Sequence, residues 1–255
     1  MNKSYPVKFN NNDISEVPGV FLYYFDSTDL PNRDIKIHKL ARRSLSIVTS
    51  SEYTQKNVRV LMRICSGERH QTEETVTSVK GLLQPQNGEL LVEQGLDFLK
   101  YTATMNEFNI EWEGATAWVE IVFIASTPIA EGSSSNTLAS FNITTPSDSA
   151  GFTVGGSYLA EPIINITINS VTGGTGSISV FNASTNQGIT ITQVFNTGDQ
   201  IEINCNTYNI TLNGGNIDFE GIFLTFPPGA QRIGYTDTFT TRNVDVTVTA
   251  NDRIV

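Results

Sequence analysis

Short runs in which apolar and polar residues alternate recur along both halves of this sequence. In the first half such runs fall at Val58–Arg63, at Leu90–Glu93 and at Val119–Ile124. Successive side chains of a β-strand point to opposite faces of a sheet, so alternation with a period of two predicts strands. Val58–Arg63 has one apolar and one largely cationic face, whereas Val119–Ile124 is apolar enough to be buried on both faces.

One segment of the first half follows a helical period instead. Its apolar residues fall at positions i, i+3, i+6 and i+7, namely Val76, Val79, Leu82 and Leu83. Thr72 is a suitable N-cap, and residues before Pro85 avoid helical angles. The pattern predicts one helix over about residues 72–84, packed on strands that form a β-barrel or β-sandwich.

The second half contains further alternating runs and no helical pattern. Ile, Val and Leu alternate with Ser, Thr, Asn and Glu in five short runs: Ile164–Asn169, Ile178–Val180, Ile189–Ile191, Ile201–Ile203 and Ile210–Leu212. Glycine-rich turn sequences separate these runs. Short strands at regular spacing with such turns predict a β-sandwich.

Charge is distributed unevenly between the two halves. Residues 1–131 contain 13 Lys and Arg and 17 Asp and Glu, whereas residues 132–255 contain 3 Arg, no Lys and 9 acidic residues. Between them, Pro128 is followed by the polar, serine-rich stretch Glu131–Asn136, which has the composition of a flexible linker. We therefore expect one domain over residues 1–131 and a second over residues 132–255.

Composition excludes several classes of protein. The 255 residues are 39% hydrophobic and 16% charged, with a net charge of −10, which is typical of a globular chain. No apolar run approaches the roughly 20 residues that span a bilayer, so we expect no membrane insertion. The N-terminus lacks the apolar core of a secretory signal, so we expect synthesis in the cytoplasm. An acidic chain is also a poor candidate for binding nucleic acid, whose phosphates favour basic surfaces.

The sequence is poor in groups that could perform chemistry. Its two histidines, His38 and His70, have basic neighbours in sequence and are expected to be exposed or interface residues. Cys65 and Cys205 lie 140 positions apart and form no CxxC motif, so we expect two free thiols packed as small hydrophobic residues. We therefore predict no catalytic residue, no metal site and no cofactor.

Two polar regions leave weaker alternatives open. Gly173–Ser177 lacks the Lys-Ser/Thr ending of a phosphate-binding loop, which favours a hairpin turn. Asn213–Asp218 is rich in Asn and Asp but does not match a calcium loop, so calcium binding there is a minor alternative. A sandwich rich in Asn, Thr and aromatic residues is also compatible with a carbohydrate-binding site.

Several features of the first domain resemble the distal tail protein (Dit) family of long-tailed siphophages. These features are the basic Leu40–Arg43, the Ser50–Tyr53 that precedes a strand, the Leu82–Leu83 end of the helix and the last strand that closes at Thr127–Pro128. Each motif is weak by itself. Their order and spacing together carry the resemblance.

The second domain is similar to the C-terminal domain of the same family. Residues 197–233 contain Gly-Asp, a strand ending near Cys205, a hairpin, Asn-Gly, Phe, Pro-Gly and a closing strand, and Arg253 is in the usual terminal basic position. The resemblance implies a galectin-like β-sandwich. Residues 132–255 contain no His and no Trp, both expected in a galectin sugar site, so it does not imply lectin activity.

The resemblance implies a structural role in the virion and no enzymatic activity. Proteins of this family form a ring, commonly of six copies, at the distal end of the tail. The ring joins the tail tube protein to the tail-tip or fibre hub protein, and the outer domain often holds receptor-binding or side-fibre proteins. DNA passes through the lumen without specific binding, and we expect lumen-facing loops of residues 1–131 to carry an excess of Asp and Glu.

Candidates for the contact between ring subunits come from the basic and aromatic residues of the first domain. Arg42, Arg43, Arg59 and Arg63 could meet carboxylates of a neighbouring copy, and Tyr53 could anchor the same contact. The alternative for each arginine is a solvated strand face, and for Tyr53 a place in the core. Alternative functions are a carbohydrate- or receptor-binding module of a tail tip and a cell-wall hydrolase.

Overall fold

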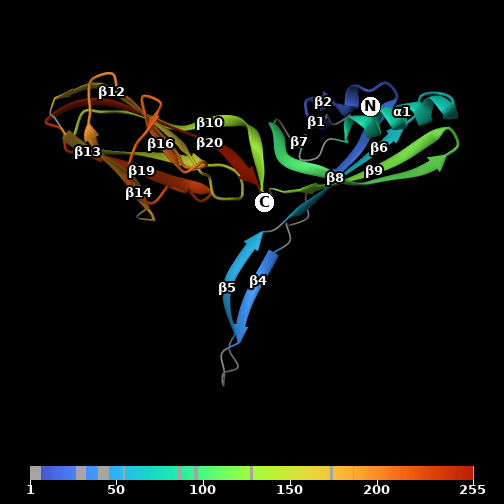
Figure 1. Cartoon of the computed structure of the whole chain (residues 1–255), viewed down its shortest axis with the longest axis horizontal. Coiled ribbons are helices and arrows are strands. Elements are labelled where there is room, and N and C mark those ends of the chain that lie inside the picture. Colours follow the sequence, from blue (N-terminus) through green and yellow to red (C-terminus); the bar gives the residue numbers. More distant parts are fainter. Residues whose placement is uncertain are drawn as a thin grey trace. The chain divides into compact units, whose positions relative to one another are not determined.

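The computed structural model describes residues 7–26, 33–39, 46–53, 55–84, 88–94, 97–126, 129–172, 175–185 and 187–254. These residues form antiparallel β-sheets and one α-helix, which confirms the expected mainly β fold (Figure 1). The chain divides into two compact units, Met1–Ser133 with Val255 (unit 1) and Ser134–Ile254 (unit 2). Each described helix is too short or too polar to cross a membrane.

Unit 1 contains an antiparallel sheet in which neighbouring strands follow the order β3-β6-β9-β8-β7-β1-β2. Its elements are β1 (Val7–Phe9), β2 (Asn12–Asp13), the 3-10 helix η1 (Ile14–Glu16), β3 (Val20–Asp26), β6 (Lys56–Ile64), β7 (Gly88–Gln94), β8 (Asp97–Glu113) and β9 (Thr116–Ala125). Strands β4 (Arg33–Lys39) and β5 (Ser46–Tyr53) pair with each other in a separate two-stranded sheet.

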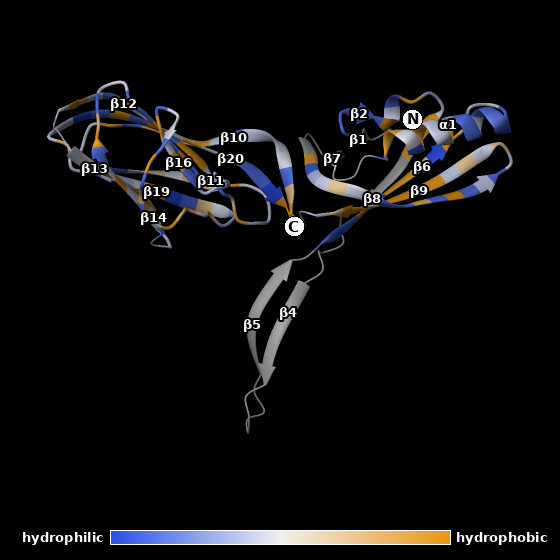
Figure 2. Cartoon of the chain, viewed as in Figure 1, coloured by the Kyte–Doolittle hydropathy of each residue, from blue (hydrophilic) through white to orange (hydrophobic). Residues whose placement is uncertain are grey.

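The core of unit 1 follows the predicted alternation. In β6, Val58, Val60 and Met62 are fully buried, and β9 buries Val119 and alternate residues after it. Figure 2 shows the resulting alternation of hydrophobic and hydrophilic positions along the strands. The three runs predicted as strands in this half correspond to β6, β7 and β9.

The helix begins earlier than the apolar period indicates. Helix α1 spans Arg69–Leu82, and its N-cap is Glu68 rather than Thr72, whose side chain is buried in the first turn. The Thr72 hydroxyl accepts a hydrogen bond from the Ser66 N–H at 3.1 Å and donates to the Glu68 carbonyl at 3.2 Å. Because the residues before Thr72 in this turn are polar and exposed, the apolar pattern could not reveal the true start.

Unit 2 is a β-sandwich. One sheet has the strand order β17-β16-β15-β12-β20-β10, and the other has the order β11-β19-β13-β14-β18. The strands are β10 (Ala130–Ile143), β11 (Ser147–Val154), β12 (Ile163–Thr172), β13 (Thr175–Asn182), β14 (Gly188–Val194), β15 (Gln200–Asn204), β16 (Asn209–Leu212), β17 (Gly215–Asn216), β18 (Glu220–Gly221), β19 (Gly229–Asp237) and β20 (Thr241–Ile254).

The core of unit 2 lies between these two sheets. The Ile and Val residues of the four predicted runs that fall in β12, β13, β14 and β15 are buried and belong to one hydrophobic cluster: Ile164, Ile166, Ile168, Ile178, Val180, Ile189, Ile191, Ile201 and Ile203. Aromatic residues complete the cluster, including an edge-to-face pair of Phe152 and Phe226 with ring centroids 5.0 Å apart. Burial of this cluster explains how a sequence so rich in Ser, Thr and Asn forms a stable sandwich.

The stretch expected to be a flexible linker is instead part of a strand. Residues 131–136 lie within β10, and the two units divide between Ser133 and Ser134. Glu131 and Gly132 pair in register with Lys100 and Leu99 of β8. The expectation was wrong because backbone pairing does not depend on side-chain composition, and the serines of this segment project into solvent.

Candidate interaction surfaces

Arg59 and Arg63 lie on the face of the unit 1 sheet that helix α1 does not cover. The guanidinium carbon of Arg69 in α1 lies 4.2 Å from the ring centroid of Trp112 in β8, and Trp112 is opposite the buried Ala117 of β9. The helix therefore covers the face to which the buried residues of β6 and β9 point. Since Arg59 and Arg63 alternate with those buried residues, they point to the opposite face.

Carboxylate side chains of β8, which lies two strands away from β6, are on this same face of the sheet. Two cross-strand rows run from an arginine on β6 through an apolar residue on β9 to a glutamate on β8: Arg63–Trp118–Glu111 and Arg59–Val122–Glu107. Neighbouring strands lie about 4.8 Å apart, so the backbones of each arginine and its glutamate are about 10 Å apart. Among the described side chains, no carboxylate forms an ion pair with either arginine. These six residues are called the charged face below.

The other predicted contact residues are less well placed. Arg42 and Arg43 lie outside the described residues. Tyr53 is the last residue of β5, opposite Arg33 of β4, and its side chain lies outside the described part of the chain. The structure therefore places Arg59 and Arg63 on one face of the sheet. That any of the five residues contacts a neighbouring copy stays a prediction.

The sequence interpretation missed the acidic side of the charged face. In β8, Glu107, Asn109 and Glu111 alternate with Phe108 and Ile110, which is a period-two signal that the sequence displays. This signal could have identified an acidic strand face. It could not have shown that β9 lies between this strand and the arginines of β6.

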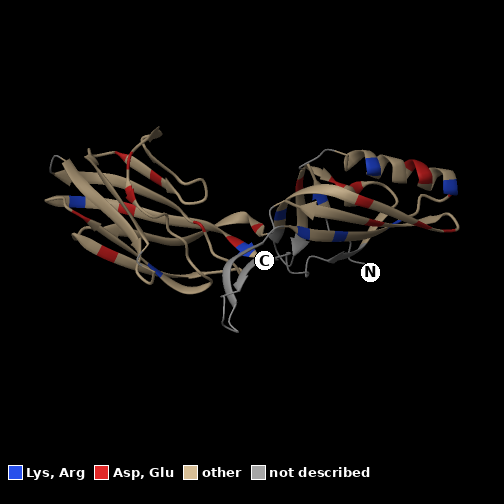
Figure 3. Ribbon diagram, turned by 60° about the horizontal axis from the view of Figure 1, so that its bottom comes forward, with Lys and Arg blue, Asp and Glu red and all other residues tan. Residues whose placement is uncertain are grey.

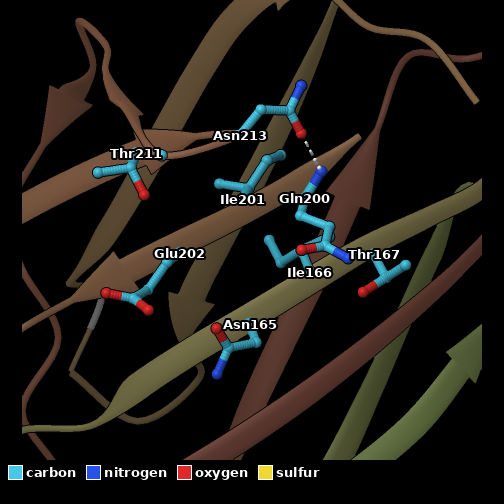
Figure 4. A pocket seen from close by; sticks show the side chains of 9 residues that line it. Asn165, Ile166, Thr167, Gln200, Ile201, Glu202, Thr211 and Asn213 are labelled. Atoms are coloured by element: carbon cyan, nitrogen blue, oxygen red, sulfur yellow. Dashed lines mark hydrogen bonds between the residues drawn. The ribbon is translucent and has the colours of Figure 1, made fainter. Parts of the chain in front are cut away.

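Unit 2 carries few charges and a polar pocket. Its three arginines are the only basic residues of this unit, as Figure 3 shows by the scarcity of blue. The pocket has a volume of about 380 Å³ and is lined by residues of β12, β15, β16 and the following turn: Asn165, Ile166, Thr167, Gln200, Ile201, Glu202, Thr211, Asn213 and Gly214 (Figure 4). The sequence shows the alternation in each strand, but only the fold brings the three strands together.

The two thiols differ in environment. Cys205 is buried, as expected, and burial raises the pKa of its thiol to about 12. Cys65 is only half-buried, because it lies just after the end of β6. A hydrogen bond from the backbone of Gly67, with a second from the Thr116 side chain, lowers the pKa of the Cys65 thiol.

The described histidine is exposed. His70 lies in the first turn of α1, with Nδ1 3.4 Å from Oε2 of Glu68. His38 is on β4, and its side chain lies outside the described residues. Within the described residues, no three His, Cys, Asp or Glu side chains are grouped closely enough to hold a metal ion.

The Asn213 region serves a structural purpose in the sandwich. Oδ1 of Asn213 accepts the backbone N–H of Gln200 at 2.9 Å, and its Nδ2 donates to Oδ1 of the buried Asp199 at 2.9 Å. Asn213 has a φ of 52°, a left-handed conformation that Asn tolerates better than most residues. The amide oxygen of Asn213, which a calcium site would use, thus already accepts a hydrogen bond.

Comparison with known protein families identifies the second unit. Residues 155–252 match the family model of the siphovirus-type tail component, C-terminal domain. Over these residues the second unit is therefore similar to the C-terminal domain of siphovirus-type tail components. Among curated proteins, none matches the chain.

Solved structures extend the likeness to both units. The crystal structure of Dit (gp 19.1) of phage SPP1, a hub of the adsorption apparatus of phages that infect Gram-positive bacteria, is similar over 99% of this chain and 100% of that one, with a TM-score of 0.73 and 12% identity. A chain of the phage P2 baseplate in its activated, calcium-containing conformation is matched over 98% of both chains, with a TM-score of 0.43 and 9% identity. The resemblance to siphophage distal tail proteins is confirmed, and the chain has the SPP1 Dit fold.

Proposed function

We propose that this protein is a structural component of a siphophage tail tip, where copies of it form a hub ring. The observation that carries the proposal is the combination of a siphovirus tail-component domain at residues 155–252 with the fold of a phage hub protein over 99% of the chain. In the virion the ring, of six copies, joins the tail tube protein to the tip or fibre hub protein. Unit 2 is available to hold receptor-binding or side-fibre proteins.

The charged face supports self-association of unit 1. A closed ring requires a heterologous contact, in which one patch of a copy meets a different patch of the next. The two arginines of β6 and the two glutamates of β8 provide such a pair of patches, because they lie on one face and form no ion pair with each other among the described side chains. Trp118, which lies between Arg63 and Glu111 and is partly exposed, offers apolar area to the same contact.

The charge balance of unit 1 supports passage of DNA. Residues 1–131 carry 17 acidic and 13 basic side chains, and an acidic lumen repels phosphates where a basic one would retain them. We expect loops of this unit that face the lumen to be acidic. A ring reconstruction with a strongly positive channel would contradict this part of the proposal.

The ring is tested by measuring the mass of the full-length protein in solution and imaging it by negative stain. Wild-type protein should form rings, and the Arg59→Glu/Arg63→Glu variant should be monomeric while retaining its circular dichroism. Arg232→Glu, at an exposed position of unit 2, is the matched control and should leave the rings intact.

A compensating change separates loss of the contact from loss of folding. Adding Glu107→Arg and Glu111→Arg to the double arginine variant reverses both patches, and ring formation should return. The proposal of self-assembly through this face is contradicted if the wild type forms no rings, or if the arginine variant assembles as well as the wild type.

The proposal assigns no chemistry to the protein. A cell-wall hydrolase would need paired carboxylates or a metal in a cleft, and zymography against host wall material tests that alternative directly. A binding role for unit 2 is the second candidate function, because this unit has a polar pocket of about 380 Å³.

A further inference from the structure

The unit 2 pocket is a grid of polar side chains on three neighbouring strands. Antiparallel register places Thr167 opposite Gln200, and Asn165 opposite Glu202, which is itself opposite Thr211. Residues opposite each other have Cβ atoms about 5 Å apart, and successive outward residues of one strand are about 7 Å apart. Figure 4 shows these side chains, from β12, β15 and β16, around the hollow.

These five side chains form no hydrogen bond with any described residue, although they lie on neighbouring strands. The adjacent part of the same sheet behaves differently. There, Asp245 accepts the amides of Asn142 and Asn169, each at 2.7 Å, so those side chains satisfy one another. The hydrogen-bond donors and acceptors of these five side chains are therefore available to a ligand in the pocket, because they do not pair with one another.

One wall of the pocket is fixed in place. The amide of Asn213 is held on one side by the Gln200 backbone and on the other by Asp199, which is buried and also accepts the Asn196 N–H at 2.7 Å. Ile166 and Ile201 also contribute to the lining, and their side chains are buried in the core on the other side of the sheet. A ligand would thus meet one pre-formed wall, which lowers the entropic cost of ordering that side of the pocket.

The chemistry of the lining selects the class of ligand. Two amides and two hydroxyls both donate and accept hydrogen bonds, and the carboxylate of Glu202 accepts two, which suits vicinal hydroxyl groups. No Lys or Arg lines the pocket, and the carboxylate of Glu202 would repel a phosphate or carboxylate, so the lining favours a neutral ligand. The three arginines of the unit are engaged elsewhere: Arg232 donates to Ser149, Arg242 pairs with Asp237, and Arg253 pairs with Glu161.

We propose that this pocket binds a neutral saccharide through Asn165, Thr167, Gln200, Glu202 and Thr211. Its volume of about 380 Å³ lies within the range of about 300–1,000 Å³ that small-molecule sites occupy. The proposal uses none of the His or Trp chemistry of a galectin, since unit 2 contains neither residue. It is independent of ring formation, because all lining residues belong to one copy.

The test begins with the full-length protein on an array of neutral and anionic glycans. A neutral glycan that binds is then titrated, as a soluble monovalent ligand, by saturation-transfer NMR or calorimetry. Glu202→Gln replaces an acceptor oxygen by a donor without changing shape, and Asn165→Ala removes an amide. Each should weaken binding about ten-fold, the loss typical of a hydrogen bond to a charged or paired polar group.

Glu220→Gln is the matched control, because Glu220 is exposed on β18 at the edge of the other sheet. It should bind the glycan as the wild type does, and all variants should retain the wild-type circular dichroism. The proposal is overturned if no neutral glycan binds, if only anionic glycans bind, or if Glu202→Gln and Asn165→Ala bind with unchanged affinity.

Discussion

A buried ion pair in unit 2 gives the most stringent test of the structure. The Asp237 side chain is fully buried and that of Arg242 is 7% exposed, with Nε and Oδ1 2.8 Å apart. The same Oδ1 accepts the Phe239 N–H at 2.9 Å, and the guanidinium also donates to the Phe239 carbonyl. Asp237→Ala would leave the Arg242 cation buried without its counter-ion.

The expected cost follows from this burial. Removing one partner of a buried pair destabilises a protein by about 3–5 kcal/mol, because an uncompensated charge stays in the interior. Unit 2 contains about 120 residues, for which 1 kcal/mol corresponds to about 4 °C in Tm, so its Tm should fall by about 12–20 °C. Replacing both partners, as in Asp237→Leu/Arg242→Met, should recover most of this loss, since well-packed apolar residues often substitute for a buried pair without cost.

The chain contains its own control for the measurement. Both tryptophans, Trp112 and Trp118, are in unit 1, so tryptophan fluorescence follows the unfolding of unit 1, whereas calorimetry and circular dichroism follow both units. Asp237→Ala should lower the calorimetric transition of unit 2 and leave the fluorescence transition unchanged. A loss below about 1 kcal/mol, or a double variant as unstable as the single one, would refute the argument from burial.

Three further predictions concern single positions. Cys65 should react with iodoacetamide well before Cys205, because a backbone hydrogen bond lowers the pKa of the Cys65 thiol whereas burial raises that of Cys205 to about 12; mass spectrometry of labelled peptides checks this, and equal labelling rates would contradict it. Hydrogen bonds from the amides of Asn142 in β10 and then Asn169 in β12 lower the pKa of Asp245. The stabilising effect of the Asp245 carboxylate is therefore complete above the ordinary carboxyl pKa of about 3.9, and it is lost as the pH falls through the lowered pKa of the folded state. Because Asp245 is exposed, Asp245→Asn should lower the free energy of unfolding by less than about 1 kcal/mol at pH 7, and urea titrations should show no difference near pH 2. Gly156→Ala should cost more stability than Gly198→Ala. Both glycines have a positive φ, which costs an alanine about 1–2 kcal/mol. At position 156 the new Cβ would also lie 2.3 Å from a backbone oxygen of β20, whereas at position 198 it would meet no atom within 4 Å. Equal losses in thermal denaturation would mean that this close approach is absent.

Local patterns in the sequence were sufficient for the strands and for the existence of the helix. The apolar residues of the period-two runs around Val60, Val119, Ile166 and Ile201 are buried as predicted. Residues two apart in a strand lie on the same face of the sheet, whichever strands are its neighbours. The apolar pattern could not locate the start of α1, because the residues before Thr72 in its first turn are polar and exposed. The serine-rich segment of β10 was misread for a related reason, because composition does not reveal the strand to which it belongs, whose residues Glu131 and Gly132 pair with β8.

The order of strands in each sheet was decided by the tertiary structure alone. Sequence alternation predicts that Arg59 and Arg63 share a face, but only the insertion of β9 between β6 and β8 separates them from Glu107 and Glu111. In unit 2, β15 lies between β12 and β16, which are distant from each other in sequence, and this order assembles the polar grid of the pocket. Alternation fixes which side of a strand is buried, whereas the neighbours of that strand depend on long-range backbone pairing that no local pattern encodes.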